Sequence, residues 1–216
     1  MRNFITNEWL TVFTLLGLLL IAVAKSINPL RFKDFLIVIG NSKYLKLYAK
    51  DRKLVDLFSS ILFINFLIVV SVFIYFSYSN FSTPLNFELS LYLKLLAVLS
   101  VVLLIKNILE KYISTVLNID HIITGYLFQK ITFKNYSGLV ILIANLFLIY
   151  TQGSSKLIII ITGLLYVLIN AIGFFTSYNY YRKLINPNIF YFLLYLCALE
   201  IGPYIILYKI LSDFKI

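Results

Sequence analysis

An acidic residue lies in the middle of the last apolar segment of the chain, where a charge is costly to maintain. Glu200 falls within the segment 189–209 and is followed by Gly202 and Pro203. An ionised side chain at the bilayer centre costs about 2.5–3.5 kcal/mol on insertion scales, so such residues usually face protein or water. Pro203 leaves the carbonyl one turn earlier without its helical donor, and Ala198 and Gly202 are spaced for close helix packing. We therefore expect Glu200 to have a function or to bind a partner at a weakened helical turn. The alternative is a protonated structural residue that hydrogen-bonds a neighbouring backbone group.

Other polar residues at comparable depth could form one layer with Glu200. At 1.5 Å per residue, Glu200 lies about 16 Å from the inner end of its segment, and three asparagines lie about 12–13 Å from the inner ends of theirs. Lys94 enters from the outer side, about 8 Å deep. It would either neutralise Glu200 or extend outward to the interface, and its position near a segment end favours the second. The alternative for the amides is simple interhelical hydrogen bonding, worth about 0.6 kcal/mol each. The asparagines are Asn65, Asn145 and Asn170.

The elements that must position these side chains are six apolar segments. Of the 216 residues, 61% are hydrophobic and only 13% are charged, whereas soluble domains are about 25% charged. A span of about 20 apolar residues crosses one bilayer core, and in lipid it must be helical because every backbone polar group needs an internal partner. We predict a single all-α transmembrane domain, a bundle of about six helices with interfacial amphipathic helices on the cytoplasmic side. The predicted spans are 9–24, 57–78, 89–108, 136–150, 157–178 and 189–209.

The basic residues predict how this bundle is oriented. Fourteen of the 19 lysines and arginines fall in alternate connections between the segments or, in the case of Lys106, in the last turn before one. Such an excess marks the cytoplasmic side, so both termini are expected in the periplasm. Positive charge after the first segment exceeds that before it, which favours a retained helix over a cleaved signal peptide. The fourteen are Lys25, Arg31, Lys33, Lys43, Lys46, Lys50, Arg52, Lys53, Lys106, Lys111, Lys130, Lys134, Arg182 and Lys183.

Two stretches on the predicted cytoplasmic side have amphipathic spacing. In the first, which follows Ser42 as a possible N-cap, four lysines share one face and fit a helix lying on anionic headgroups. The alternative is a docking face for an acidic partner or a phosphorylated lipid headgroup. In the second, apolar residues at 109, 112, 113 and 116 lie opposite Glu110, Lys111 and Ser114. The four lysines are Lys43, Lys46, Lys50 and Lys53.

The common catalytic and metal-binding signatures are missing from the sequence. Cys197 and His121 are single residues of their types, so the usual zinc ligand sets cannot be assembled. There is no nucleophile elbow, phosphate-binding glycine loop or dinucleotide fingerprint. We therefore expect no metal and no cofactor, and a non-enzymatic protein is favoured. A basic cytoplasmic face explains the net charge of +10, so no nucleic-acid partner is expected.

Three segments of the sequence resemble a known family. They are 6–9 (TNEW), 126–130 (YLFQK) and 195–204 (YLCALEIGPY), the last followed by 206–209 (ILYK). Together they resemble the uncharacterised Bacteroidota inner-membrane family called domain of unknown function 4271, over nearly the whole chain. The resemblance implies a bacterial cytoplasmic membrane and supplies no catalytic residues.

Three functions follow as hypotheses. The first is a non-enzymatic subunit or assembly factor of a cell-envelope complex, with another membrane protein and anionic lipid as partners. The second is a small proton-coupled carrier that uses Glu200, for which a broken helix near the midplane is a typical sign. The third is an enzyme that modifies phosphorylated lipid carriers at the basic surface. It would need a cluster of carboxylates there, and Asp51, Asp56, Glu110 and Asp120 are scattered along the chain.

Overall fold

The computed structural model describes residues 8–41, 43–48, 56–81, 88–116, 120–150 and 155–185. Within these ranges the chain forms seven α-helices and no strand. The predicted all-α membrane fold is confirmed. The helices are α1 (Glu8–Ile27), α2 (Pro29–Leu36), α3 (Lys43–Tyr48), α4 (Leu57–Phe81), α5 (Leu89–Val116), α6 (Asp120–Tyr150) and α7 (Ser155–Ile185).

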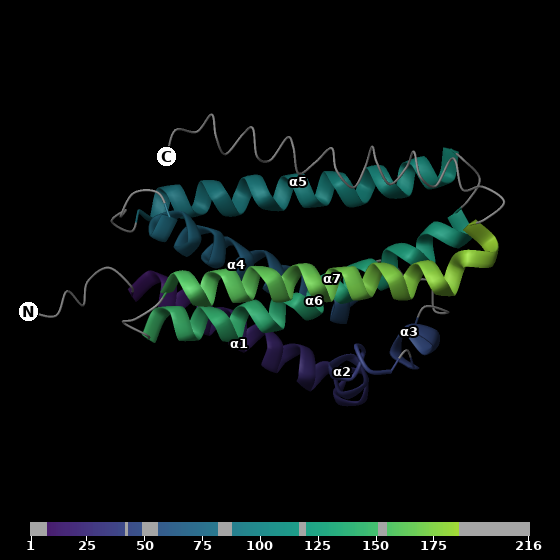
Figure 1. Ribbon diagram of the computed structural model, residues 1–216, viewed down its shortest axis with the longest axis horizontal. Coiled ribbons are helices and arrows are strands. Elements are labelled where there is room, and N and C mark those ends of the chain that lie inside the picture. The colour runs from purple at the N-terminus through teal and green to yellow at the C-terminus, as the bar shows by residue number, and fades with distance from the viewer. Residues whose placement is uncertain are drawn as a thin grey trace, which may run out of the picture.

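Five of the seven helices are long and apolar enough to cross a bilayer, and they run along the long axis of the molecule (Figure 1). The chain is therefore a multi-pass membrane protein. The predicted sixth span, 189–209, lies outside the described residues. The five candidate spans are Trp9–Ile27, Leu57–Phe81, Leu89–Tyr112, Thr124–Tyr150 and Lys156–Tyr180.

The largest difference from the predicted boundaries is at α6. The prediction began the fourth span at residue 136, but the helix begins at Asp120 and is 31 residues long. Lys130, Lys134 and Asn135 gave that stretch the composition of a loop, yet all three are largely buried in the bundle. A 31-residue helix is about 46 Å long, so α6 reaches beyond a hydrocarbon core of about 30 Å.

Helix α6 is the centre of the bundle. It packs most extensively on α7 and α4 and also contacts α1 and α5. Of its candidate span, 61% is buried, against 22% for the spans of α1 and α7. The outer faces of α1 and α7 are lined by exposed leucine, isoleucine and valine side chains, as expected for helices in contact with lipid.

The two short helices lie at one end of the bundle, where they meet the first turn of α4 (Figure 1). We call it the basic end because α2 and α3 carry arginine and lysine residues. Helix α2 has a proline at its first position and Asn28 as its N-cap, whose side-chain oxygen accepts the backbone N–H of Arg31. Phe35 of α2 packs edge-on against Tyr44 of α3, Phe58 of α4 and Tyr136 of α6. The short helices are thus part of the core.

Candidate functional site

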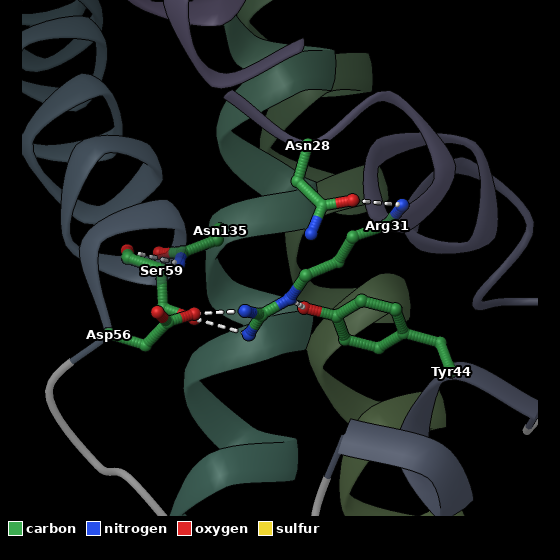
Figure 2. Close-up of polar contacts among 6 residues, drawn as sticks. All are labelled: Asn28, Arg31, Tyr44, Asp56, Ser59 and Asn135. Atoms are coloured by element: carbon green, nitrogen blue, oxygen red, sulfur yellow. Dashed lines mark hydrogen bonds and ion pairs between the residues drawn. The ribbon is translucent and has the colours of Figure 1, made fainter. Parts of the chain in front are cut away.

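An arginine on α2 reaches across to the start of α4. The Asn28 cap positions Arg31 in the first turn of α2, and its guanidinium forms an ion pair with the carboxylate of Asp56 (Figure 2). The guanidinium also donates to the hydroxyl of Ser59 at 3.4 Å, and its Nε donates to the hydroxyl of Tyr44 at 3.4 Å. We call Arg31, Tyr44, Asp56 and Ser59 the Arg31 clasp. It joins three helices at the basic end.

Aromatic rings enclose the arginine of the clasp. The guanidinium carbon lies 4.8 Å from the ring centres of both Tyr48 and Phe58, within the range of cation–π attraction. Burial lowers the pKa of Arg31, but Tyr44 and Asp56 together outweigh burial, so its pKa is raised. The pKa of Tyr44 is also raised, mainly by burial, although Arg31 opposes the shift. Both groups therefore keep their ordinary protonation states, and the clasp is suited to holding helices together.

Helix α6 is attached beside the clasp. The side-chain amide of Asn135 donates to the backbone carbonyl of Ser59 at 3.2 Å (Figure 2). Asn135 is almost fully buried, so the bond is shielded from competing water. The first turn of α4 is thereby tied both to α2 and to α6.

A second group of charges is buried between α5 and α6. The carboxylate of Glu110 lies 2.7 Å from the ammonium of Lys130 and 3.9 Å from that of Lys106. The side chains of Lys106 and Glu110 are fully buried, and that of Lys130 is 14% exposed. We call these three residues the Glu110 cluster. Breaking such a buried pair is costly because it leaves an uncompensated charge in a low-dielectric site.

The cluster lies in the predicted amphipathic stretch after residue 108. On its polar side Glu110 and Ser114 are buried and Lys111 is exposed, while Leu109 and Tyr112 of its apolar side are exposed. The stretch is the last part of α5. The physical reason is the solvent, because around a transmembrane helix the apolar face turns to lipid and the polar face turns to protein.

Two of the predicted polar residues are buried on α4 and α6, which pack against each other. Asn65 of α4 and Asn145 of α6 are fully buried, and the Asn145 amide donates to the Val69 carbonyl of α4 at 2.9 Å. Gly17 of α1 packs on the same site, where a Cβ would lie 3.0 Å from the Asn65 side-chain oxygen and 3.0 Å from Leu142. Within the described residues, neither polar atom of the Asn65 side chain has a hydrogen-bond partner. Three helices therefore converge on a polar residue at mid-depth.

The other two predicted polar residues are elsewhere. Asn170 of α7 donates to the Tyr166 carbonyl of its own helix at 2.8 Å and lines a cavity between α6 and α7. Lys94 of α5 is exposed. In the described part of the chain Asn65 and Asn145 are therefore both buried in the bundle, while Asn170 and Lys94 lie at other places. Glu200 and the helix break at Ala198, Gly202 and Pro203 lie outside the described residues.

The predicted lysine face is only partly described. Helix α3 begins at Lys43, whose backbone N–H is accepted by Asn41 at 2.9 Å. Lys43 is exposed and lies 4.0 Å from Asp34, while Tyr44 and Leu45 turn into the core. The side chain of Lys46 and all of Lys50 and Lys53 lie outside the described residues.

The two charge groups were not predicted as sites. The sequence placed Arg31, Lys106 and Lys130 on the cytoplasmic side only as charges. Asp56 and Glu110 were considered as scattered carboxylates for an enzyme. A helical signal was available for one pair, because Lys106 and Glu110 are one turn apart. The pairing of Arg31 with Asp56 joins residues 25 positions apart and had no local signal. In the described ranges, no three His, Cys, Asp or Glu side chains gather as a metal site would require.

These features describe a helical membrane protein in which two groups of paired charges join helices at one end. The family described as Domain of unknown function (DUF4271) matches residues 10–211. The chain belongs to that family, and the resemblance seen in the sequence is confirmed. Neither a curated protein nor a solved structure matched the chain significantly.

Proposed function

We propose that the protein is a non-enzymatic subunit or assembly factor of a cell-envelope complex in the cytoplasmic membrane of Bacteroidota. The observation that supports this most is that acidic side chains at the basic end are paired with basic ones. Asp56 pairs with Arg31, and at a separate place Glu110 pairs with Lys106 and Lys130. An enzyme acting on lipid carriers would need such carboxylates together and open to substrate, so this arrangement favours a structural role.

The basic end is also shaped to lie on a membrane surface. Around the clasp, α2 and the turn after it expose Leu30, Leu36 and Ile37 together with Lys33, and α3 exposes Leu47 and Lys43. Apolar side chains flanked by lysines bind the headgroup region of an anionic leaflet. With the basic end in the cytoplasm, both termini would be periplasmic. The partners would be anionic lipid and a second membrane protein, with no nucleic acid.

Two measurements test this proposal. A reporter that is active only in the periplasm, fused after residue 45, should be inactive, and the same reporter fused after residue 85 should be active. The reverse pattern would refute the orientation. The full chain, extracted from its native membrane in a mild detergent, should bring down a stoichiometric membrane protein. A monodisperse particle containing this chain alone would contradict the subunit role.

A carrier is the second candidate, and the buried amide of Asn65 favours it. A polar side chain without a hydrogen-bond partner at mid-depth is costly unless it serves a ligand, an ion or water. In this reading Glu200 carries the proton, and Glu200→Gln abolishes flux while abundance and folding stay normal. Normal growth and normal function of the Glu200→Gln strain would exclude it.

A further inference from the structure

A cavity of about 310 Å³ lies between α6 and α7. Ligand pockets generally range from about 300 to 1,000 Å³, so it is large enough for a small headgroup. Its polar lining is formed by polar side chains at helical spacing on the facing sides of α6 and α7. These residues are Tyr126, Lys130 and Lys134 of α6, and Tyr166, Asn170 and Ser177 of α7.

The cavity exists because small residues of α7 face α6. Ala171 and Gly173 form part of the wall. At Gly173 the two helices approach so closely that a Cβ would lie 2.5 Å from the ring of Phe133. This contact fixes the separation of α6 and α7, and the small side chains beside it leave space that larger ones would fill.

Ser177 differs from the other helical hydroxyl groups that line this bundle. Ser71, Ser100 and Thr162 each donate to a carbonyl one turn earlier, at 2.7–2.8 Å. The hydroxyl of Ser177 is also buried, with 1% of the residue exposed, but it has no hydrogen-bond partner among the residues that the structure describes. A buried hydroxyl without a partner costs about 1–3 kcal/mol. Its place in the cavity wall provides a ligand with a ready donor.

The charged residues of the described lining are both lysines, Lys130 and Lys134, and Lys134 is only 4% exposed. Ammonium groups beside hydroxyl and amide donors suit a phosphate group, which accepts several charge-assisted hydrogen bonds. Counted from Ser155, the first residue of α7 and the end away from the basic end, Asn170 lies about 22 Å along the helix and Ser177 about 33 Å. The cavity therefore extends from within the hydrocarbon to the headgroup level at the basic end.

We infer that this cavity binds a phosphate group, carried by a phospholipid headgroup or free in solution. Lys130, Lys134 and Ser177 are the residues that would bind it. Lys130 also contacts Glu110 at 2.7 Å, so the bound anion would be held at the edge of the Glu110 cluster. The inference goes beyond the subunit role and requires only that the chain spans a bilayer.

The test uses the purified full chain in detergent micelles. Dioctanoyl phosphatidic acid is titrated as the probe, with inorganic phosphate and dioctanoyl phosphatidylcholine in parallel, and binding is followed by thermophoresis. The expected result is saturable binding of phosphatidic acid that Lys134→Gln weakens about tenfold or more and Ser177→Ala about fivefold. Competition by inorganic phosphate would show that the phosphate group alone is recognised. Binding of the lipid without such competition would show that the acyl chains contribute.

Matched variants separate the cavity from general charge. Lys94→Gln removes an exposed lysine outside the cavity lining. Thr162→Ala removes a buried hydroxyl of α7, the helix that carries Ser177, and this hydroxyl already donates to the Ile158 carbonyl. Both should bind as the wild type does, and all variants should remain monodisperse. Equal affinity of the wild type, Lys134→Gln and Ser177→Ala would overturn the inference. So would equally tight binding of phosphatidylcholine, or no saturable binding of either anion. None of these results depends on whether a protein partner co-purifies.

Discussion

Replacing Glu110 by glutamine should destabilise the bundle more than any other single charge change at the described basic end. The side chains of Lys106 and Glu110 are fully buried and that of Lys130 is 14% exposed. Glutamine keeps the size of the side chain and removes only its charge. Two buried ammonium groups then lose the carboxylate that both contact.

The expected cost follows from the burial of the pair. Removing one partner of a buried ion pair costs about 3–5 kcal/mol. Glutamine retains one carbonyl oxygen that can accept from Lys130, so we expect the lower end, about 3 kcal/mol. Lys130→Met combined with Glu110→Gln should cost less than the sum of the single changes, with a coupling energy of about 0.5–3 kcal/mol.

The measurement is reversible unfolding in mixed micelles, with the denaturing detergent titrated and helicity followed by circular dichroism. Lys111→Gln is the matched control, because Lys111 is the exposed neighbour of Glu110 on the same helix. Its unfolding free energy should be within about 0.5 kcal/mol of the wild type. If Glu110→Gln also unfolds at the wild-type midpoint and shows no coupling to Lys130, then the cluster does not stabilise the bundle.

Three further predictions concern other sites. Asp56→Asn should lower the unfolding free energy by about 1–2 kcal/mol, which is less than for Glu110→Gln because the Asp56 side chain is 31% exposed. Limited proteolysis should then cut α2–α3 faster. An unchanged cutting rate would contradict the role of Arg31. Gly173→Ala should cost about 1–3 kcal/mol because the new methyl group meets Phe133, and a thermal midpoint equal to the wild type would show that α7 shifts freely. Lys94→Gln should leave the unfolding midpoint unchanged because the residue is exposed, and a clear loss of stability would reveal a buried partner.

The sequence predicted the fold class best in the long apolar segments that lie in lipid. Composition and segment length predicted an all-α membrane bundle, because hydrocarbon permits only helices with internally paired backbones. The start of α6 could not be predicted in the same way. Lys130, Lys134 and Asn135 interrupt its apolar composition, and only tertiary contacts such as the bond from Asn135 to Ser59 explain why they lie inside the bundle.

Helical periodicity identified two faces around Glu110 but not which of them turns inward. In water the apolar face is buried, while in lipid the polar face is buried, and a stretch at the membrane boundary can follow either rule. The Arg31 clasp was beyond local pattern analysis, since it depends on α2 folding back toward the first turn of α4. Depth counting placed Asn65 and Asn145 at a similar level, but the count for Asn145 started at residue 136, whereas α6 begins at Asp120.

The Arg31 clasp has a consequence for biogenesis. Its acidic and basic members are separated by only 25 residues, so it can close as soon as the ribosome has delivered the beginning of α4, before α5, α6 and α7 exist. Chains fold from the N-terminus as they are synthesised, and the first two transmembrane helices would thus form a hairpin held by the clasp. That hairpin offers the later helices a preformed surface, and the Ser59 carbonyl is the point to which Asn135 subsequently attaches.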